Sequence, residues 1–182
     1  MIRIIDFLAA FFGLLVLWPV LLVVIVIGVF DTGSPIFVQE RMGRNKKTFK
    51  LIKFRTMSRD TLSVASHLAS NTSITKLGAF LRKTKIDELP QLFNVLKGEM
   101  SLVGPRPNLL NQHDLISERE RLGVYNVAPG ITGLAQIQNI DMSTPELLAK
   151  IDKKMIDTLS IKDYFKYILK TVTGSGCGDA VK

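Results

Sequence analysis

The chain has 182 residues, which is enough for about one domain and a membrane anchor. Its net charge of +8 favours a partner that carries phosphates or other negative charge, such as an anionic lipid or a phosphorylated substrate. The single cysteine, Cys177, excludes an internal disulfide and a zinc site built on cysteines, and it is consistent with a reducing compartment.

An apolar stretch without any charged residue runs from Phe7 to Phe30. As one straight helix it would be roughly 36 Å long, and a hydrocarbon core is about 30 Å thick. Pro19 lies near its middle, removes a backbone hydrogen bond and predicts a kink. Two arrangements follow from the residues: a helix that spans the membrane, or a re-entrant helix that enters one leaflet and returns.

The apolar stretch also sets the expected division of the chain. We expect a membrane-embedded helix over residues 1–30, a cytoplasmic catalytic domain over 31–173 and a flexible tail over 174–182. Basic residues follow the apolar stretch closely, which places the globular part in the cytoplasm and offers contacts to anionic headgroups. These residues are Arg41, Arg44, Lys46, Lys47, Lys50 and Lys53.

The rest of the chain predicts an α+β fold that is mostly helical. Two strands, Pro35–Arg41 and Thr48–Thr56, flank a turn at Gly43–Asn45 and form a hairpin. Short helices are expected over Lys76–Arg82 and over Leu89–Leu96; the second has Pro90 in its first turn and Gly98 at its end.

Loops and two further helices complete the expected architecture. We interpret Ser58–Thr75 as a loop or poorly ordered helix and the stretch from Pro129 to Gly133 as a second loop. Thr144 before a proline, and Ser160 before Asp163, each predict the start of a helix. The last helix is amphipathic and basic, so it lies on a membrane surface or packs on the core.

Adjacent carboxylates, Asp87 and Glu88, are the leading candidates for chemistry. Asp87 can cap the helix that follows, and the positive end of the helix dipole would favour its ionised form. An ionised carboxylate is a possible nucleophile, although capping alone also explains an aspartate here. Arg82, Lys83 and Lys85 add positive charge nearby.

Other cations are candidates for phosphate binding. Arg106 stands between two prolines, so a stiff backbone would hold its forked guanidinium; a solvated turn is the alternative. Lys53 and Arg55 share one face of the second strand and could bind phosphate together. The alternative is that this face is an ordinary solvated strand face. His67 and His113 belong to no metal-binding motif, and aromatic residues are not interleaved with basic ones, so nucleic acid is not an expected partner.

Together these segments resemble the bacterial sugar transferase family, the monotopic phosphoglycosyl transferases, over roughly Ile4 to Val172. The matching stretches are Ile36–Gln39 with Arg41 and Gly43, Phe49–Met57, Lys76–Gly78, Leu81–Lys83, Asp87–Gly98, Met100–Pro107 and Pro129–Gln136. Two positions depart from the family pattern. Trp18 stands where a serine often precedes the membrane proline, and no arginine follows Gln136 closely, which leaves the donor preference open.

The resemblance implies an enzyme with a re-entrant helix at the cytoplasmic face of the bacterial inner membrane. It implies that Asp87 attacks a UDP-sugar, that UMP leaves, and that undecaprenyl phosphate then takes the sugar phosphate, which starts polysaccharide assembly such as O-antigen or capsule. Magnesium is the implied cofactor, with Asp87 and Glu88 as its ligands. The substrate-binding candidates are Lys53, Arg55, Arg82, Arg106 and Gln136.

Two alternatives to this reaction remain open at the level of sequence. One is direct attack by the lipid phosphate on the same donor without a covalent enzyme, in which Asp87 serves as a base or metal ligand. The other is a non-catalytic membrane module that recruits enzymes of glycan assembly. The sequence does not name the sugar, the pathway or the oligomeric state.

Overall fold

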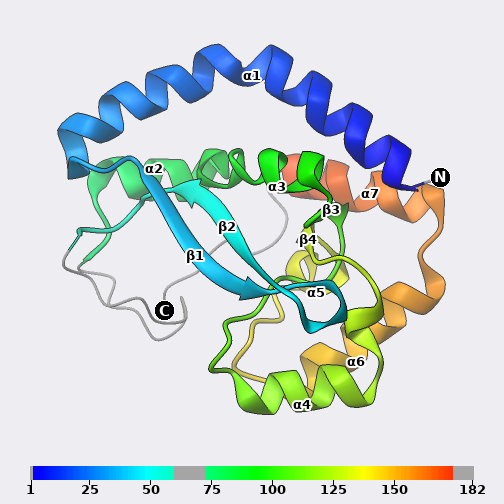
Figure 1. The fold of residues 1–182 in the computed structure, drawn as a ribbon. Helices are drawn as coiled ribbons and strands as arrows, with labels where there is room; N and C mark the ends of the chain where they lie inside the picture. Colours follow the sequence, from blue (N-terminus) through cyan, green and yellow to red (C-terminus); the bar gives the residue numbers. More distant parts are fainter. Residues whose placement is uncertain (1, 60–72, 174–182) are drawn as a thin grey trace.

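The computed structural model describes residues 2–59 and 73–173 and has the mixed, mostly helical fold that was expected (Figure 1). The predicted loop Ser58–Thr75 lies largely outside the described residues, and the predicted tail 174–182 lies wholly outside them. The helices are α1 Ile2–Thr32, α2 Lys76–Thr84, α3 Gln91–Lys97, α4 His113–Arg121, α5 Leu134–Ile137, α6 Pro145–Thr158 and α7 Ile161–Val172. The strands are β1 Ile36–Met42, β2 Thr48–Phe54, β3 Ser101–Val103 and β4 Gly130–Thr132.

The apolar stretch forms helix α1, which continues through Pro19 and arches over the rest of the fold (Figure 1). Both ends of α1 contact the same domain. Near its start, Arg3 donates from Nη2 to the Leu96 carbonyl at 2.9 Å, and near its end the Asp31 carboxylate accepts from Thr75 Oγ1 at 2.7 Å. One side of the helix is buried against the domain, while its outer side exposes Phe12, Leu15, Val16, Trp18, Leu22, Val23, Val26 and Phe30.

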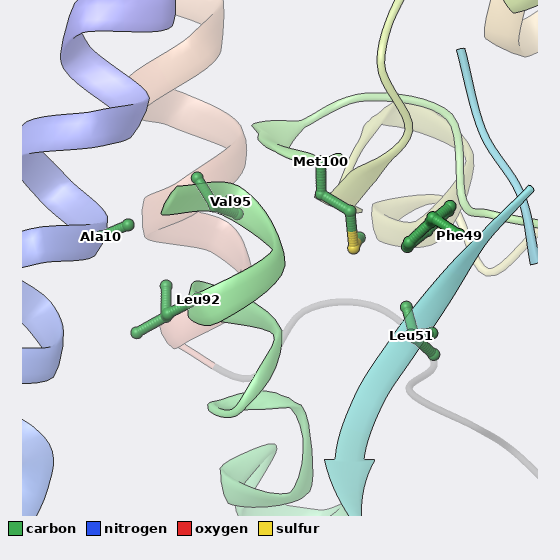
Figure 2. Close-up of a cluster of buried hydrophobic side chains, with 6 residues drawn as sticks. All are labelled: Ala10, Phe49, Leu51, Leu92, Val95 and Met100. Carbon is green, nitrogen blue, oxygen red and sulfur yellow. The ribbon is translucent and has the colours of Figure 1, made fainter. Parts of the chain in front are cut away.

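Helix α3 packs between α1 and the strands, as Figure 2 shows. Its buried side chains reach Ala10 of α1 on one side and the apolar side chains of β2 on the other. Each such side chain contributes roughly 1.5–3 kcal/mol when it is fully buried. Gly98 ends the helix with φ of 85°, a conformation that suits glycine, so the predicted end is confirmed. The cluster consists of Ala10, Phe49, Leu51, Leu92, Val95 and Met100.

Strands β1 and β2 form the predicted antiparallel hairpin, with a register that pairs Ile36 with Phe54 and Met42 with Thr48. Its tip lies on the side of the fold away from α1, beside α4 (Figure 1). There Arg44 donates from Nε to the Asn126 carbonyl at 3.1 Å, and Lys46 forms an ion pair with Glu120 of α4. Both cations therefore have partners within the domain, and the expected contact with lipid headgroups stays a prediction.

The loop expected near Pro129 is in fact a strand, because β3 and β4 pair in parallel between Ser101 and Gly130. Close approach of two backbones explains the pairing: a Cβ added to Gly130 would lie 2.0 Å from the Gly104 nitrogen. A side chain at this position would push the segments apart. The pairing therefore positions the segment that follows β3, and this segment contains Arg106.

Helices α6 and α7 begin where predicted. Thr144 is the N-cap of α6, and Ser160 Oγ accepts from the Asp163 amide at 3.1 Å at the start of α7. The expected packing of α7 on the core is confirmed by the buried Tyr164 and Tyr167, while its position on a membrane surface stays a prediction. The exposed side consists of Ile161, Phe165, Leu169 and Val172.

Candidate active site

The two carboxylates lie in a single 3-10 turn, η4 Ile86–Glu88, which joins α2 to α3. Asp87 is 2% exposed and Glu88 7% exposed. The prediction that Asp87 caps the following helix is wrong, because Pro90 occupies the cap position of α3. The reason is the intervening turn, in which the Leu89 amide already bonds to the Ile86 carbonyl at 3.1 Å. A helix dipole acting on a capping carboxylate therefore does not account for the site.

Arg106 contacts Glu88, one member of the carboxylate pair. Its Nη2 donates to Glu88 Oε1 at 3.1 Å, and its side chain is 23% exposed. A guanidinium carries five N–H donors in a fork that matches the oxygens of a carboxylate or a phosphate. Arg106 is thus no solvated turn residue, and the contact joins the segment after β3 to the turn before α3.

A small hollow beside this ion pair brings together cations from both strands. Lys53 of β2 is buried there, so the strand face that it shares with Leu51 is not solvated. Arg41 of β1 and Gln91 of α3 also line the hollow, and neither was predicted as a site residue. Clustered cations in a partly buried hollow attract phosphate groups more strongly than exposed ones. The complete lining is Arg41, Leu51, Lys53, Gln91, Arg106, Pro107, Gly130 and Ile131.

The other predicted substrate-binding residues lie outside this lining. Arg55 donates from Nε to the Ser34 carbonyl at 2.9 Å, and its guanidinium lies 5.3 Å from the centre of the Phe37 ring. Arg82 donates from Nε to Thr56 Oγ1 at 2.9 Å. Gln136 is buried on α5. Their binding roles therefore stay predictions.

A second set of buried polar residues supports the segment that carries Arg106. Arg119 of α4 pairs with Asp152 of α6 at 2.6 Å and donates from Nη1 to the Arg106 carbonyl at 2.8 Å. Burial raises the pKa of Asp152, and the Arg119 guanidinium opposes that shift. This pair is not predictable from the sequence, because the two residues are far apart in the chain and belong to no motif. His113, at the start of α4, is exposed.

The carboxylates suit one kind of metal. In residues 2–59 and 73–173, no group of three or more histidine, cysteine, aspartate or glutamate side chains could hold an ion. Magnesium needs only one or two protein carboxylates when substrate phosphates and water complete its six oxygen ligands. Asp87 and Glu88 therefore fit magnesium that binds together with a phosphorylated substrate, and they do not fit a closed protein cage.

A helix long and apolar enough to cross a membrane, buried carboxylates and a hollow lined by cations are typical of membrane-associated proteins that handle phosphorylated compounds. The chain belongs to the bacterial sugar transferase family, because the family described as "Bacterial sugar transferase" matches residues 1–175. The resemblance seen in the sequence is thus confirmed.

Characterised and uncharacterised relatives agree with the family. The "Uncharacterized sugar transferase EpsL" of Bacillus subtilis is 39% identical over 93% of this chain and 84% of its own length. The "UDP-glucose:undecaprenyl-phosphate glucose-1-phosphate transferase" of Caulobacter vibrioides is 36% identical over 93% of this chain and 67% of its own length. The chain spans only 34% of a Haemophilus influenzae relative, an "Uncharacterized sugar transferase" that is 41% identical over 78% of this chain.

Proposed function

We propose that the protein transfers a sugar-1-phosphate from a UDP-sugar to a polyprenol phosphate, such as undecaprenyl phosphate, and releases UMP. The observation that carries this proposal is the buried pair Asp87 and Glu88, in which Glu88 contacts Arg106, a residue that lines a cationic hollow. Relatives named as sugar-1-phosphate transferases to undecaprenyl phosphate support the choice of substrates. The product would start the assembly of a polysaccharide or glycoconjugate.

The proposed reaction has two displacements at one phosphorus atom. A carboxylate oxygen of Asp87 forms a bond to the β-phosphorus of the donor, and the bond between this phosphorus and the bridging oxygen breaks, so that UMP leaves with the electron pair. A phosphate oxygen of the lipid then attacks the same phosphorus, and the bond to Asp87 breaks. The products are the polyprenyl diphosphosugar and the regenerated carboxylate.

The surrounding residues would bind and orient charge in both steps. Arg106 and Lys53 neutralise the phosphates, because both line the hollow and the guanidinium can bind phosphate through two nitrogens. Glu88 holds Arg106 in place and, with Asp87, would hold magnesium. Magnesium, when bound, neutralises the diphosphate and makes UMP a better leaving group. Gln91 offers an amide to the same hollow.

We further propose that α1 is re-entrant and that the enzyme lies on the cytoplasmic face of the inner membrane. The 31 residues of α1 reach about 46 Å, which is enough to cross a bilayer. A helix that crossed would carry one end away from the domain, whereas Arg3 and Asp31 fasten both ends to it. The apolar exposed side of α7 would lie on the membrane surface, with Lys162, Lys166 and Lys170 available to lipid phosphates.

Release of UMP by the purified protein tests this function. The protein in detergent or nanodiscs would be mixed with undecaprenyl phosphate, magnesium and each member of a panel of UDP-sugars. We expect UMP release with at least one donor, accompanied by a lipid-linked product. Binding to anionic vesicles without UMP release from any donor would contradict the proposal and favour the recruitment module. Rapid turnover by an Asp87→Asn variant would favour direct attack by the lipid.

A further inference from the structure

The chain from Pro105 to Asn108 has an unusual set of backbone partners. Pro105 and Pro107 have no N–H group, so this segment cannot form a regular ladder of backbone hydrogen bonds. Its consecutive carbonyls instead accept from different parts of the fold. The donors, in order, are the Gly130 amide at 2.9 Å, Arg119 Nη1 at 2.8 Å, Arg41 Nη1 at 3.1 Å and the Met42 amide at 3.0 Å.

Two of these donors are buried guanidiniums, and they differ in one important respect. Arg41 also lines the hollow, so its loss could act directly on a bound phosphate. Arg119 is absent from the described lining of that hollow and is 1% exposed. Any effect of Arg119 on the reaction must therefore pass through the residues that it holds.

The forked guanidinium of Arg119, on α4, links Asp152 of α6 to the segment Pro105–Asn108. Nε and Nη2 both donate to Asp152 Oδ2, at 3.0 and 2.6 Å, while Nη1 donates to the Arg106 carbonyl and to Asn108 Oδ1 at 3.0 Å. Tyr125 donates its hydroxyl to the same Asn108 oxygen at 3.0 Å. A buried ion pair is often no more stabilising than apolar residues of similar size, so stability alone gives a weak reason for its presence.

We propose that Arg119, oriented by Asp152, is a positioning residue that fixes the backbone at Arg106 and thereby holds the Arg106 guanidinium against Glu88. This inference rests on the proposed transfer reaction. The Arg106 guanidinium contacts Glu88 at 3.1 Å, and the carbonyl of the same residue accepts from Arg119 Nη1 at 2.8 Å. A shift of about 1 Å in such a group can reduce a rate by roughly a hundredfold.

A double-mutant cycle on UMP release tests the proposal. Arg119→Lys keeps the charge, but a single ammonium cannot serve both Asp152 and the Arg106 carbonyl. We expect it to lower kcat/KM at least about tenfold in the wild-type background and less than about twofold in an Arg106→Ala background. The matched control is Arg121→Lys, on the same helix but in an exposed pair with Glu118, and it should leave kcat/KM unchanged. Equal losses in both backgrounds would overturn the proposal.

Hydrogen–deuterium exchange gives a second readout that does not require activity. We expect the amides of the four residues other than proline in 104–109 to exchange at least about threefold faster in Arg119→Lys, while those of the β1–β2 hairpin keep the wild-type rate. Unchanged exchange at 104–109 would overturn the proposal. If the wild-type protein releases UMP from no donor, the proposed function fails and exchange alone decides the role of Arg119. Asp152→Asn replaces Arg119→Lys in both experiments if the latter does not fold.

Discussion

Removal of the Arg106 side chain tests the ion pair at the candidate active site. Arg106→Ala would delete the 3.1 Å contact to Glu88, whose side chain is 8% exposed, and the forked cation beside the hollow. A hydrogen bond to a charged group is worth about 1.5–3 kcal/mol, and about 1.4 kcal/mol corresponds to a factor of ten. We therefore expect kcat/KM for the UDP-sugar to fall roughly 10- to 150-fold.

The same change leaves the buried Glu88 carboxylate without this partner, so the thermal midpoint should also fall, and the kinetics are measured well below that midpoint. The assay is UMP release at subsaturating and saturating donor, together with the thermal midpoint of unfolding. Arg44→Ala is the matched control, since Arg44 is an exposed arginine that bonds to a backbone carbonyl at the hairpin tip. Wild-type kcat/KM in Arg106→Ala, or a loss of activity that follows unfolding, would refute this reasoning.

Three further predictions address stability, binding and topology. Burial, and the Asp6 carboxylate of α1, raise the pKa of the Tyr164 hydroxyl above its ordinary value of 10.0. The neutral hydroxyl therefore stabilises the fold fully below about pH 10, and this stabilisation is lost as the pH rises further. Thermal midpoints of the wild type should thus fall more steeply above about pH 10 than those of Tyr164→Phe, and equal slopes would contradict this. Lys53→Met should raise KM for the donor more than Arg55→Met, because only Lys53 lines the hollow; steady-state kinetics with equal effects would speak against that assignment. In a Cys177→Ser background, a cysteine at Ile4 should be labelled only after cells are permeabilised, and labelling of intact cells by an impermeant reagent would show a spanning helix.

Much of the fold was predictable because local signals and tertiary structure agree. The hairpin follows from two β-rich runs around a glycine turn, Gly98 marks the end of α3, and Thr144 and Ser160 mark the starts of α6 and α7. Pro90, predicted in the first turn of α3, lies just before that helix as its N-cap. The sequence also identifies the carboxylate pair as a candidate site, but Asp87 lies in a 3-10 turn and is not the N-cap of α3.

The missed features depend on contacts that are distant in the chain. Helix α4 has a mostly polar sequence whose buried side chains include Leu115 and Arg119, so its periodicity is weak. Strands β3 and β4 are three residues each, too short for an alternating pattern, and they pair only because Gly104 and Gly130 permit close approach. Arg41 looked like one cation among several, and only the folded chain places it in the hollow.

Intact-protein mass spectrometry after mixing the enzyme with UDP-sugar and magnesium, without lipid, tests the central claim most directly. The account predicts a mass increase equal to one phosphosugar, mapped to Asp87 by peptide analysis, and no such adduct in Asp87→Asn. Glu88→Gln should slow the formation of the adduct without moving its site, and Asp87→Glu should slow it about a hundredfold through displacement of the carboxylate. An adduct at another residue, or full turnover by Asp87→Asn, would contradict the covalent mechanism.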